Sequence, residues 1–259
     1  MGGETRVRAF FTRRPLLGAL AIWVVSFVFQ ASGAAIITTV APQTPELIQR
    51  LILLLLLCVG VVALLTALRW WRGAGFVGPS HWRNLWMIAP PALLCVIPLV
   101  GGVQSLDAAT LAIFVVGYLG TGFMEESLFR GVIFGFLRPR GIGQAVVIST
   151  ILFGTLHLTR LFFGSSPMTV AWQILFAACW GVALAGLWLR MGTIWPIIGL
   201  HALWDFTLNI GHLPTMLYPV VHLALLGYGI YLLRSGARKG EASSPQEQPA
   251  AAVATSTAP

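Results

Sequence analysis

Three acidic side chains stand inside apolar stretches that are long enough to cross a membrane: Glu125, Glu126 and Asp205. An acidic group at the centre of a spanning helix costs about 2.5 to 3.5 kcal/mol on insertion scales. Such groups normally face the interior of a bundle or a water-filled cavity, and they pair with one another. These three carboxylates are therefore the first candidates for chemistry.

An arginine follows the two adjacent glutamates by about one helical turn. Glu126 and Arg130 are four residues apart, so a helix places them on one face, where they can form an internal ion pair. Glu125 is rotated by about 100° from Glu126 and can point to a neighbouring helix. Adjacent carboxylates repel each other, which suits one of them to take up and release a proton. The alternative is that Glu126 and Arg130 only stabilise the fold.

Two histidines stand in other apolar stretches, each with a partner at helical spacing. His157 follows Phe153 by four residues, and His201 precedes Asp205 by four. A single histidine in a bundle is more often a packing residue than a functional one. Two of them, together with three carboxylates and an arginine on three helices, indicate a site. His222, in the last apolar stretch, is interpreted as interfacial.

One glutamate and two histidines suffice to activate a water molecule, in either of two ways. Glu125, His157 and His201 can hold a divalent metal such as zinc with one open position. Alternatively, Glu125 and His157 act directly as general bases while His201 and Asp205 stabilise an oxyanion. Orienting His201 is the simpler role for Asp205, because an ionised carboxylate repels the developing negative charge. The sequence leaves both routes open, and no cofactor is certain.

Other hydrolytic routes leave motifs that this sequence lacks. There is no H-E-x-x-H zinc motif, no G-x-S-x-G nucleophile elbow and no glycine-rich phosphate loop. Serine chemistry is therefore not expected.

The composition indicates an integral membrane protein. Charged residues make up only 9 % of the 259 positions, hydrophobic residues make up 57 %, and the mean hydropathy is +0.85. A spanning helix needs about 20 apolar residues. We predict an all-α, polytopic fold with eight such helices, at 16–40, 46–68, 84–101, 108–137, 143–162, 168–190, 194–210 and 214–233.

The basic residues show how the chain is oriented. If the N-terminus is cytoplasmic, thirteen of the sixteen fall in cytoplasmic segments, only Arg50 and Arg160 fall on the other side, and Arg130 lies within a span. We therefore predict a multi-pass protein of the cell inner membrane with both termini cytoplasmic. The net charge of +8 forms no contiguous patch, so the expected partner is the lipid bilayer and not nucleic acid.

Three regions are expected along the chain. Residues 1–15 form a basic cytoplasmic N-terminus, 16–234 form the eight-helix domain, and 235–259 form a disordered cytoplasmic tail rich in Ala, Ser, Pro and Gln. An alternative for the start is an export signal that begins at Thr12, but the apolar run that follows is longer than a signal peptide needs.

Three motifs occur in order between residues 118 and 210: E-E-x-x-x-R, F-x-x-x-H and H-x-x-x-D, which place Glu125, Glu126, Arg130, Phe153, His157, His201 and Asp205. In this order they resemble the CPBP family of intramembrane proteases, which contains CAAX prenyl endopeptidases and bacteriocin-processing or abortive-infection proteins.

The resemblance implies an eight-helix bundle of the type II CAAX prenyl protease kind. It also implies an endopeptidase, glutamic or metal-dependent, in which Glu125, His157 and His201 activate water at a cavity open to the membrane interface. The implied partner is a membrane-associated peptide or protein substrate. Asp205 stands where the prenyl-protease branch has asparagine, so details of that branch do not carry over directly.

Two functions of other classes compete with proteolysis. A proton-coupled transporter would relay protons through the same glutamates and histidines, although no repeated halves are visible in the sequence. A non-catalytic immunity or scaffold protein would keep the fold and tolerate replacement of the site residues.

Overall fold

The computed structural model describes residues 5–80 and 82–242, and every regular element in these ranges is a helix. The only strand-like pairing in the described part is an isolated antiparallel β-bridge between Val103 and Gly211. The elements are α1 (Arg6–Arg13), α2 (Pro15–Val40), α3 (Glu46–Leu68), η1 (Trp82–Ile88), α4 (Ala89–Cys95), η2 (Ile97–Gly101), α5 (Ala108–Glu126), η3 (Ser127–Phe134), α6 (Gly135–Leu137), η4 (Arg138–Arg140), α7 (Ile142–Leu156), η5 (His157–Phe163), α8 (Pro167–Met191), α9 (Trp195–Ile210) and α10 (Leu217–Ala242).

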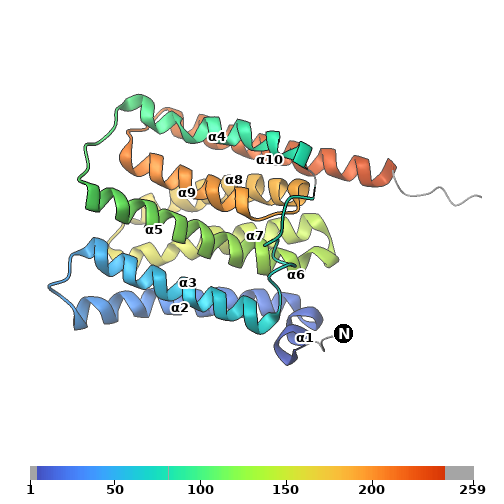
Figure 1. Ribbon diagram of the computed structural model, residues 1–259, viewed down its shortest axis with the longest axis horizontal. Helices are drawn as coiled ribbons and strands as arrows, with labels where there is room; N and C mark the ends of the chain where they lie inside the picture. The colour runs from blue at the N-terminus through green and yellow to red at the C-terminus, as the bar shows by residue number, and fades with distance from the viewer. Residues whose placement is uncertain (1–4, 81, 243–259) are drawn as a thin grey trace, which may run out of the picture.

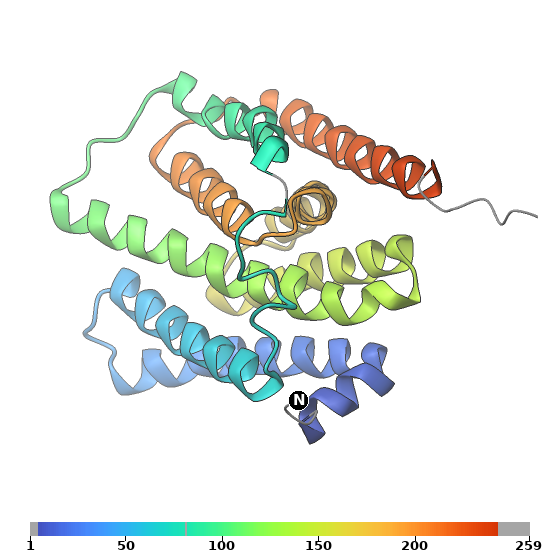
Figure 2. The same ribbon diagram turned by 45° about the vertical axis from the view of Figure 1, so that its right-hand side comes forward.

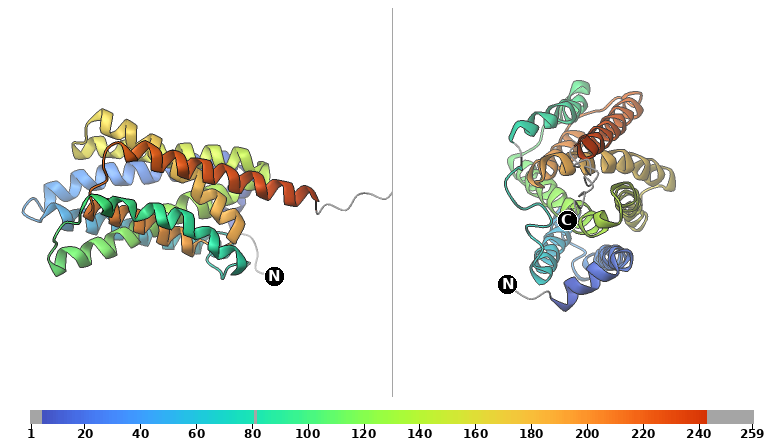
Figure 3. Two further views of the ribbon diagram at one scale, coloured as in Figure 1. Left: turned by 90° about the horizontal axis from the view of Figure 1, so that it is seen from above. Right: turned by 90° about the vertical axis from the view of Figure 1, so that its right-hand side faces the viewer.

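These elements form one bundle of rods that run in alternating directions (Figure 1). The three short helices η1, α4 and η2 make one rod, α5 to η4 make another, and α7 continues into η5. Helix α5 lies in the middle, packed on one side against α3 and on the other against α9 (Figure 2). Helix α8 packs against α7 and α10. Because the rods alternate, α1 and the last turns of α10 lie at the same end (Figure 3).

The prediction of an all-α, polytopic membrane fold is confirmed. Seven helical segments of the described chain are long and apolar enough to cross a membrane. They match seven of the eight expected spans to within a few residues. The largest differences are in the fourth segment, which continues to Arg140, and in the last, which begins at Leu217. The eighth expected span is helix α9, with 16 residues. A helix of that length extends about 24 Å, which is less than a hydrocarbon core of about 30 Å.

Two helices are interrupted where their sequence or site requires it. The rod made of η1, α4 and η2 breaks at Val96, before Pro98, because proline lacks the N–H that would continue the helix. The rod that begins with α5 was expected to be one regular helix. It becomes π-helical at Ser127, directly after the two glutamates. Such π segments are rare in proteins and frequently occur at functional sites.

The two ends of the chain differ from the expected regions. Within the basic N-terminal segment, Thr5 caps the short helix α1, and residues 1–4 lie outside the described part. The expected tail was to begin at residue 235, yet α10 continues to Ala242. Alanine, arginine, lysine and glutamate in this stretch all favour helix. The rest of the expected tail, residues 243–259, lies outside the described residues.

The close approach of α5 and α9 depends on Gly122. A Cβ atom built on Gly122 would lie 2.7 Å from the carbonyl oxygen of Ile198 and 3.5 Å from Cβ of His201. The first contact is with backbone, which cannot turn aside as a side chain can. Glycine at this position therefore lets the two helices that carry the glutamates and His201 come together.

We expect Gly122→Ala to lower the unfolding free energy by about 1 to 3 kcal/mol, because the added methyl forces α5 away from α9. Gly117→Ala on the same helix is the matched control, since a Cβ there meets nothing within 4 Å. Its stability should be unchanged or slightly raised. Thermal unfolding of the purified variants in detergent measures both, and equal melting temperatures for the two would contradict this account of the contact.

Candidate active site

A single carboxylate oxygen joins three of the predicted site residues. Glu126 Oε1 accepts a hydrogen bond from Arg130 Nη1 at 3.0 Å and another from His201 Nδ1 at 2.7 Å. Glu126 and Arg130 are almost completely buried, with relative exposures of 0 % and 1 %. The ion pair expected from the four-residue spacing is present, and it also holds a histidine that is 75 residues away in the chain.

The opposite edge of the His201 ring faces two more carboxylates. Its Nε2 lies 3.4 Å from Glu125 Oε2 and 3.5 Å from Asp205 Oδ2. Glu125 comes from the last turn of α5, and Asp205 comes from the turn of α9 that follows His201. One imidazole therefore bridges the buried Glu126–Arg130 pair and the more accessible carboxylates.

Phe153 connects His157 to this group. Its ring lies edge-on to both imidazoles, with centroid separations of 5.3 Å to His157 and 6.0 Å to His201. The guanidinium of Arg130 lies over the same ring, with Cζ 4.2 Å from the centroid. The second motif, F-x-x-x-H, thus supplies both a histidine and the aromatic ring on which the rest of the site packs.

The ring nitrogens of His157 have distinct surroundings. Nδ1 lies 3.1 Å from the carbonyl oxygen of Phe153, which can only accept a hydrogen bond. Nδ1 therefore carries the proton in the neutral ring, and Nε2 is left as the acceptor. His157 is also the residue at which α7 ends and the 3₁₀ helix η5 begins.

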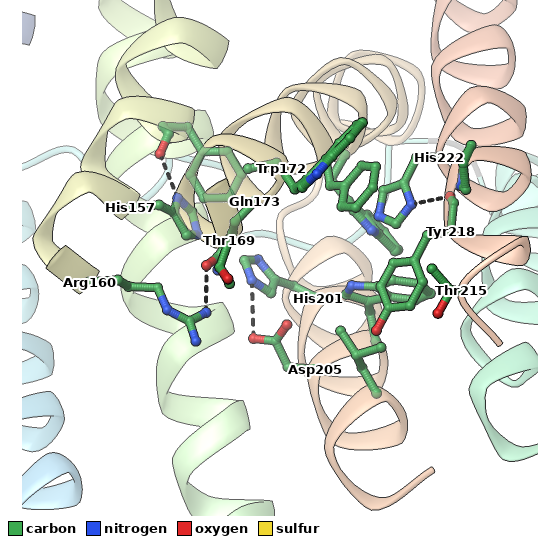
Figure 4. A pocket seen from close by; sticks show the side chains of 17 residues that line it. His157, Arg160, Thr169, Trp172, Gln173, His201, Asp205, Thr215, Tyr218 and His222 are labelled. Atoms are coloured by element: carbon green, nitrogen blue, oxygen red, sulfur yellow. Dashed lines mark hydrogen bonds and ion pairs between the residues drawn. The ribbon is translucent and has the colours of Figure 1, made fainter. Parts of the chain in front are cut away.

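A cavity of about 550 Å³ adjoins the two histidines (Figure 4). His157, His201 and Asp205 line it, and Figure 4 shows their side chains directed toward the same space. Glu125, Glu126 and Arg130 are not among the lining residues. The structure therefore brings the six predicted residues into one connected group. His157, His201 and Asp205 line the cavity, Glu125 lies beside Nε2 of His201, and Glu126 and Arg130 lie at the Nδ1 edge of the ring.

The remainder of the cavity wall is largely aromatic, and this part was missed in the sequence. The aromatic side chains of the wall come mainly from α8, α9 and α10: Trp172, Phe176, Trp180, Trp204 and Tyr218.

His222, which was expected to be interfacial, is buried in this wall. Its ring stacks on Phe176 at 4.0 Å, and its Nδ1 bonds to the carbonyl oxygen of Tyr218 at 2.6 Å. The only signal for it in the sequence was a histidine inside an apolar span.

The suggested metal ligands do not form a metal site as they are arranged. Within the described residues, no three side chains of His, Cys, Asp or Glu are placed to hold one ion together. Because the described donors are not grouped around one point, no step of the proposed mechanism passes through a metal.

Fold and site together define a class: a polytopic all-α membrane protein with an acid–base cluster between its helices. Residues 107–207 match the model of one family, the type II CAAX prenyl endopeptidase Rce1-like family. All three motifs lie inside the matched range, so the resemblance drawn from them is confirmed there. Among curated proteins, none matches this chain. The family match supports a function of the intramembrane CAAX protease type.

We expect Glu126→Gln to destabilise the fold by about 3 to 5 kcal/mol, because it leaves the buried Arg130 charge uncompensated. Glu46→Gln is the matched control: it removes an exposed pair at four-residue spacing, Glu46–Arg50, whose side chains are 71 % and 55 % exposed. That loss should be about 0 to 1 kcal/mol. Unfolding by SDS titration compares the two, and a loss of the same size in both would mean that burial does not decide the strength of the pair.

Proposed function

We propose that the chain is an intramembrane endopeptidase that hydrolyses peptide bonds in membrane-associated peptides or proteins. The observation that carries this proposal is the position of His201. Its ring forms part of the cavity wall while Glu125 and Asp205 flank its Nε2, and His157 lines the same cavity. A bond that enters the cavity would thus meet acid, base and hydrogen-bond donor together.

Glu125 and His157 are proposed to activate the water. His157 presents an unprotonated Nε2, because its Nδ1–H is used by the carbonyl of Phe153. Glu125 contributes a carboxylate beside His201. One of these bases takes a proton as the water oxygen attacks the carbonyl carbon, and the same proton is then delivered to the leaving amine nitrogen. The peptide bond breaks, and one carboxylic acid and one amine result.

His201 is proposed to stabilise the oxyanion that forms on the carbonyl. Its Nδ1 is held by Glu126, so in the doubly protonated ring Nε2–H is the donor available to the substrate. Asp205 orients this edge of the ring from the following turn. Glu126 and Arg130 act through His201 and do not meet the substrate, which makes them positioning residues.

We expect Glu125→Gln to lower the rate of peptide hydrolysis by about 10²- to 10⁴-fold, the usual contribution of a general base. Glu46→Gln, which changes an exposed glutamate at the start of α3, should leave the rate unchanged. The measurement is cleavage of a peptide library by protein purified in detergent, with mass spectrometry of the products. Wild type and Glu125→Gln that behave alike on every peptide would rule out the proposal.

We also expect hydrolysis to need no bound metal, because the bases described above belong to the chain. Elemental analysis of the purified protein should find less than stoichiometric zinc, and prolonged dialysis against a chelator should leave the rate of cleavage unchanged. One zinc ion per chain, together with loss of cleavage that zinc alone restores, would favour the metal-dependent route instead.

A further inference from the structure

The basic residues of the described chain gather at one end of the bundle. This is the end that holds α1, the end of α3, the start of η1, the turn between η4 and α7, the end of α8 and the last part of α10 (Figure 1). It carries Arg6, Arg8, Arg13, Arg14, Arg69, Arg72, Arg83, Arg138, Arg140, Arg190 and Arg234. Arg238 and Lys239 follow in the last turns of α10.

The opposite end carries very little positive charge. Arg50 and Arg160 are its basic residues in the described part of the chain, and Arg50 is paired with Glu46. Because short cytoplasmic loops hold an excess of lysine and arginine, the end that contains α1 faces the cytoplasm. The other end then faces away from it.

The cavity lies in the half of the bundle away from the basic end. Three elements contribute to it near their ends at the weakly charged side: α8 through its first half, α10 through its first two turns, and η5 after the end of α7. Helix α9 contributes from its middle onward, through His201, Asp205 and Leu208. The exposed lining residues mark its mouth, and they are Arg160, Thr169, Trp172, Thr215 and Pro219. Phe153, Trp180 and His201 are buried and form its deep end.

The mouth is also held by backbone pairing at that end of the bundle. The N–H of Gln104, before α5, bonds to the carbonyl oxygen of Ile210 at 2.7 Å, and Val103 pairs with Gly211 in the connection that contains Thr215. Across the mouth, Arg160 Nη1 donates to Gln173 Oε1 at 2.5 Å. The opening is therefore built from ordered connections and not from the basic loops.

From the distribution of basic residues and the position of the cavity mouth, we infer that the catalytic cavity opens to the extracytoplasmic side of the membrane. The inference rests on the proposed proteolysis for its meaning: the substrates would be peptide segments presented from outside the cytoplasm, such as the outer ends of membrane-spanning helices. A peptide confined to the cytoplasm would meet the basic end of the bundle, where this cavity has no mouth.

Single cysteines at the two ends test the orientation of the cavity. Thr215→Cys places a thiol at the mouth, and Pro139→Cys places one on the exposed turn between Arg138 and Arg140 without removing a charge. The background is a chain in which Cys58, Cys95 and Cys179 are replaced by alanine. A membrane-impermeant maleimide is added to spheroplasts that express each variant, and again after permeabilisation.

We expect Thr215→Cys to be labelled in intact spheroplasts and Pro139→Cys only after permeabilisation. The reverse pattern, or equal labelling of both in intact spheroplasts, would overturn the inference. Labelling of both variants in detergent confirms that each thiol is accessible in the folded protein. Labelling requires no hydrolysis, so the two proposals can fail separately. A reversed labelling pattern together with Glu125-dependent cleavage would contradict only the proposed orientation of the cavity. The expected labelling pattern without any cleavage would contradict only the proposed proteolysis.

Discussion

The arrangement of this protein depends on one buried carboxylate that serves two partners. Glu126 Oε1 binds Arg130 on its own helical rod and His201 on the neighbouring helix α9, which is distant in the sequence. Burying an ion costs several kcal/mol even after the protein relaxes, so each member of the group needs the other two. The pairing explains why α5 and α9 must approach closely, why Gly122 stands at their contact, and why Phe153 lies against the guanidinium. Removing Glu126 would leave both a cation and a histidine without their common acceptor.

Local patterns predicted much of this structure, because they depend on neighbouring residues alone. The apolar runs gave the bounds of α3 to the residue and those of most other spans to within a few residues. The four-residue spacing gave the Glu126–Arg130 pair. What a pattern of this kind cannot give is contact between distant segments. The bond from His201 to Glu126 joins two helices whose relative rotation depends on packing along their whole length.

Other features went unpredicted for similar reasons. The π-helical turn at Ser127 carries no distinctive residues, since its sequence is compatible with an ordinary helix. The aromatic wall around His222 consists of side chains that, taken singly, read as packing residues of apolar spans. Glu125 was predicted as a site residue from its type and position, but its place beside Nε2 of His201 follows only from the three-dimensional arrangement.

The shortness of α9 bears on the surrounding lipid. This helix carries His201 and Asp205, and it is about 6 Å shorter than a typical hydrocarbon core is thick. Where a helix is too short, acyl chains compress beside it or headgroups and water move inward. Either response shortens the distance between bulk water and the cluster. Membranes of short-chain lipids would therefore bring water closer to the cluster than thick, sterol-rich ones, so under the proposed function the thickness of the bilayer would help to set the rate.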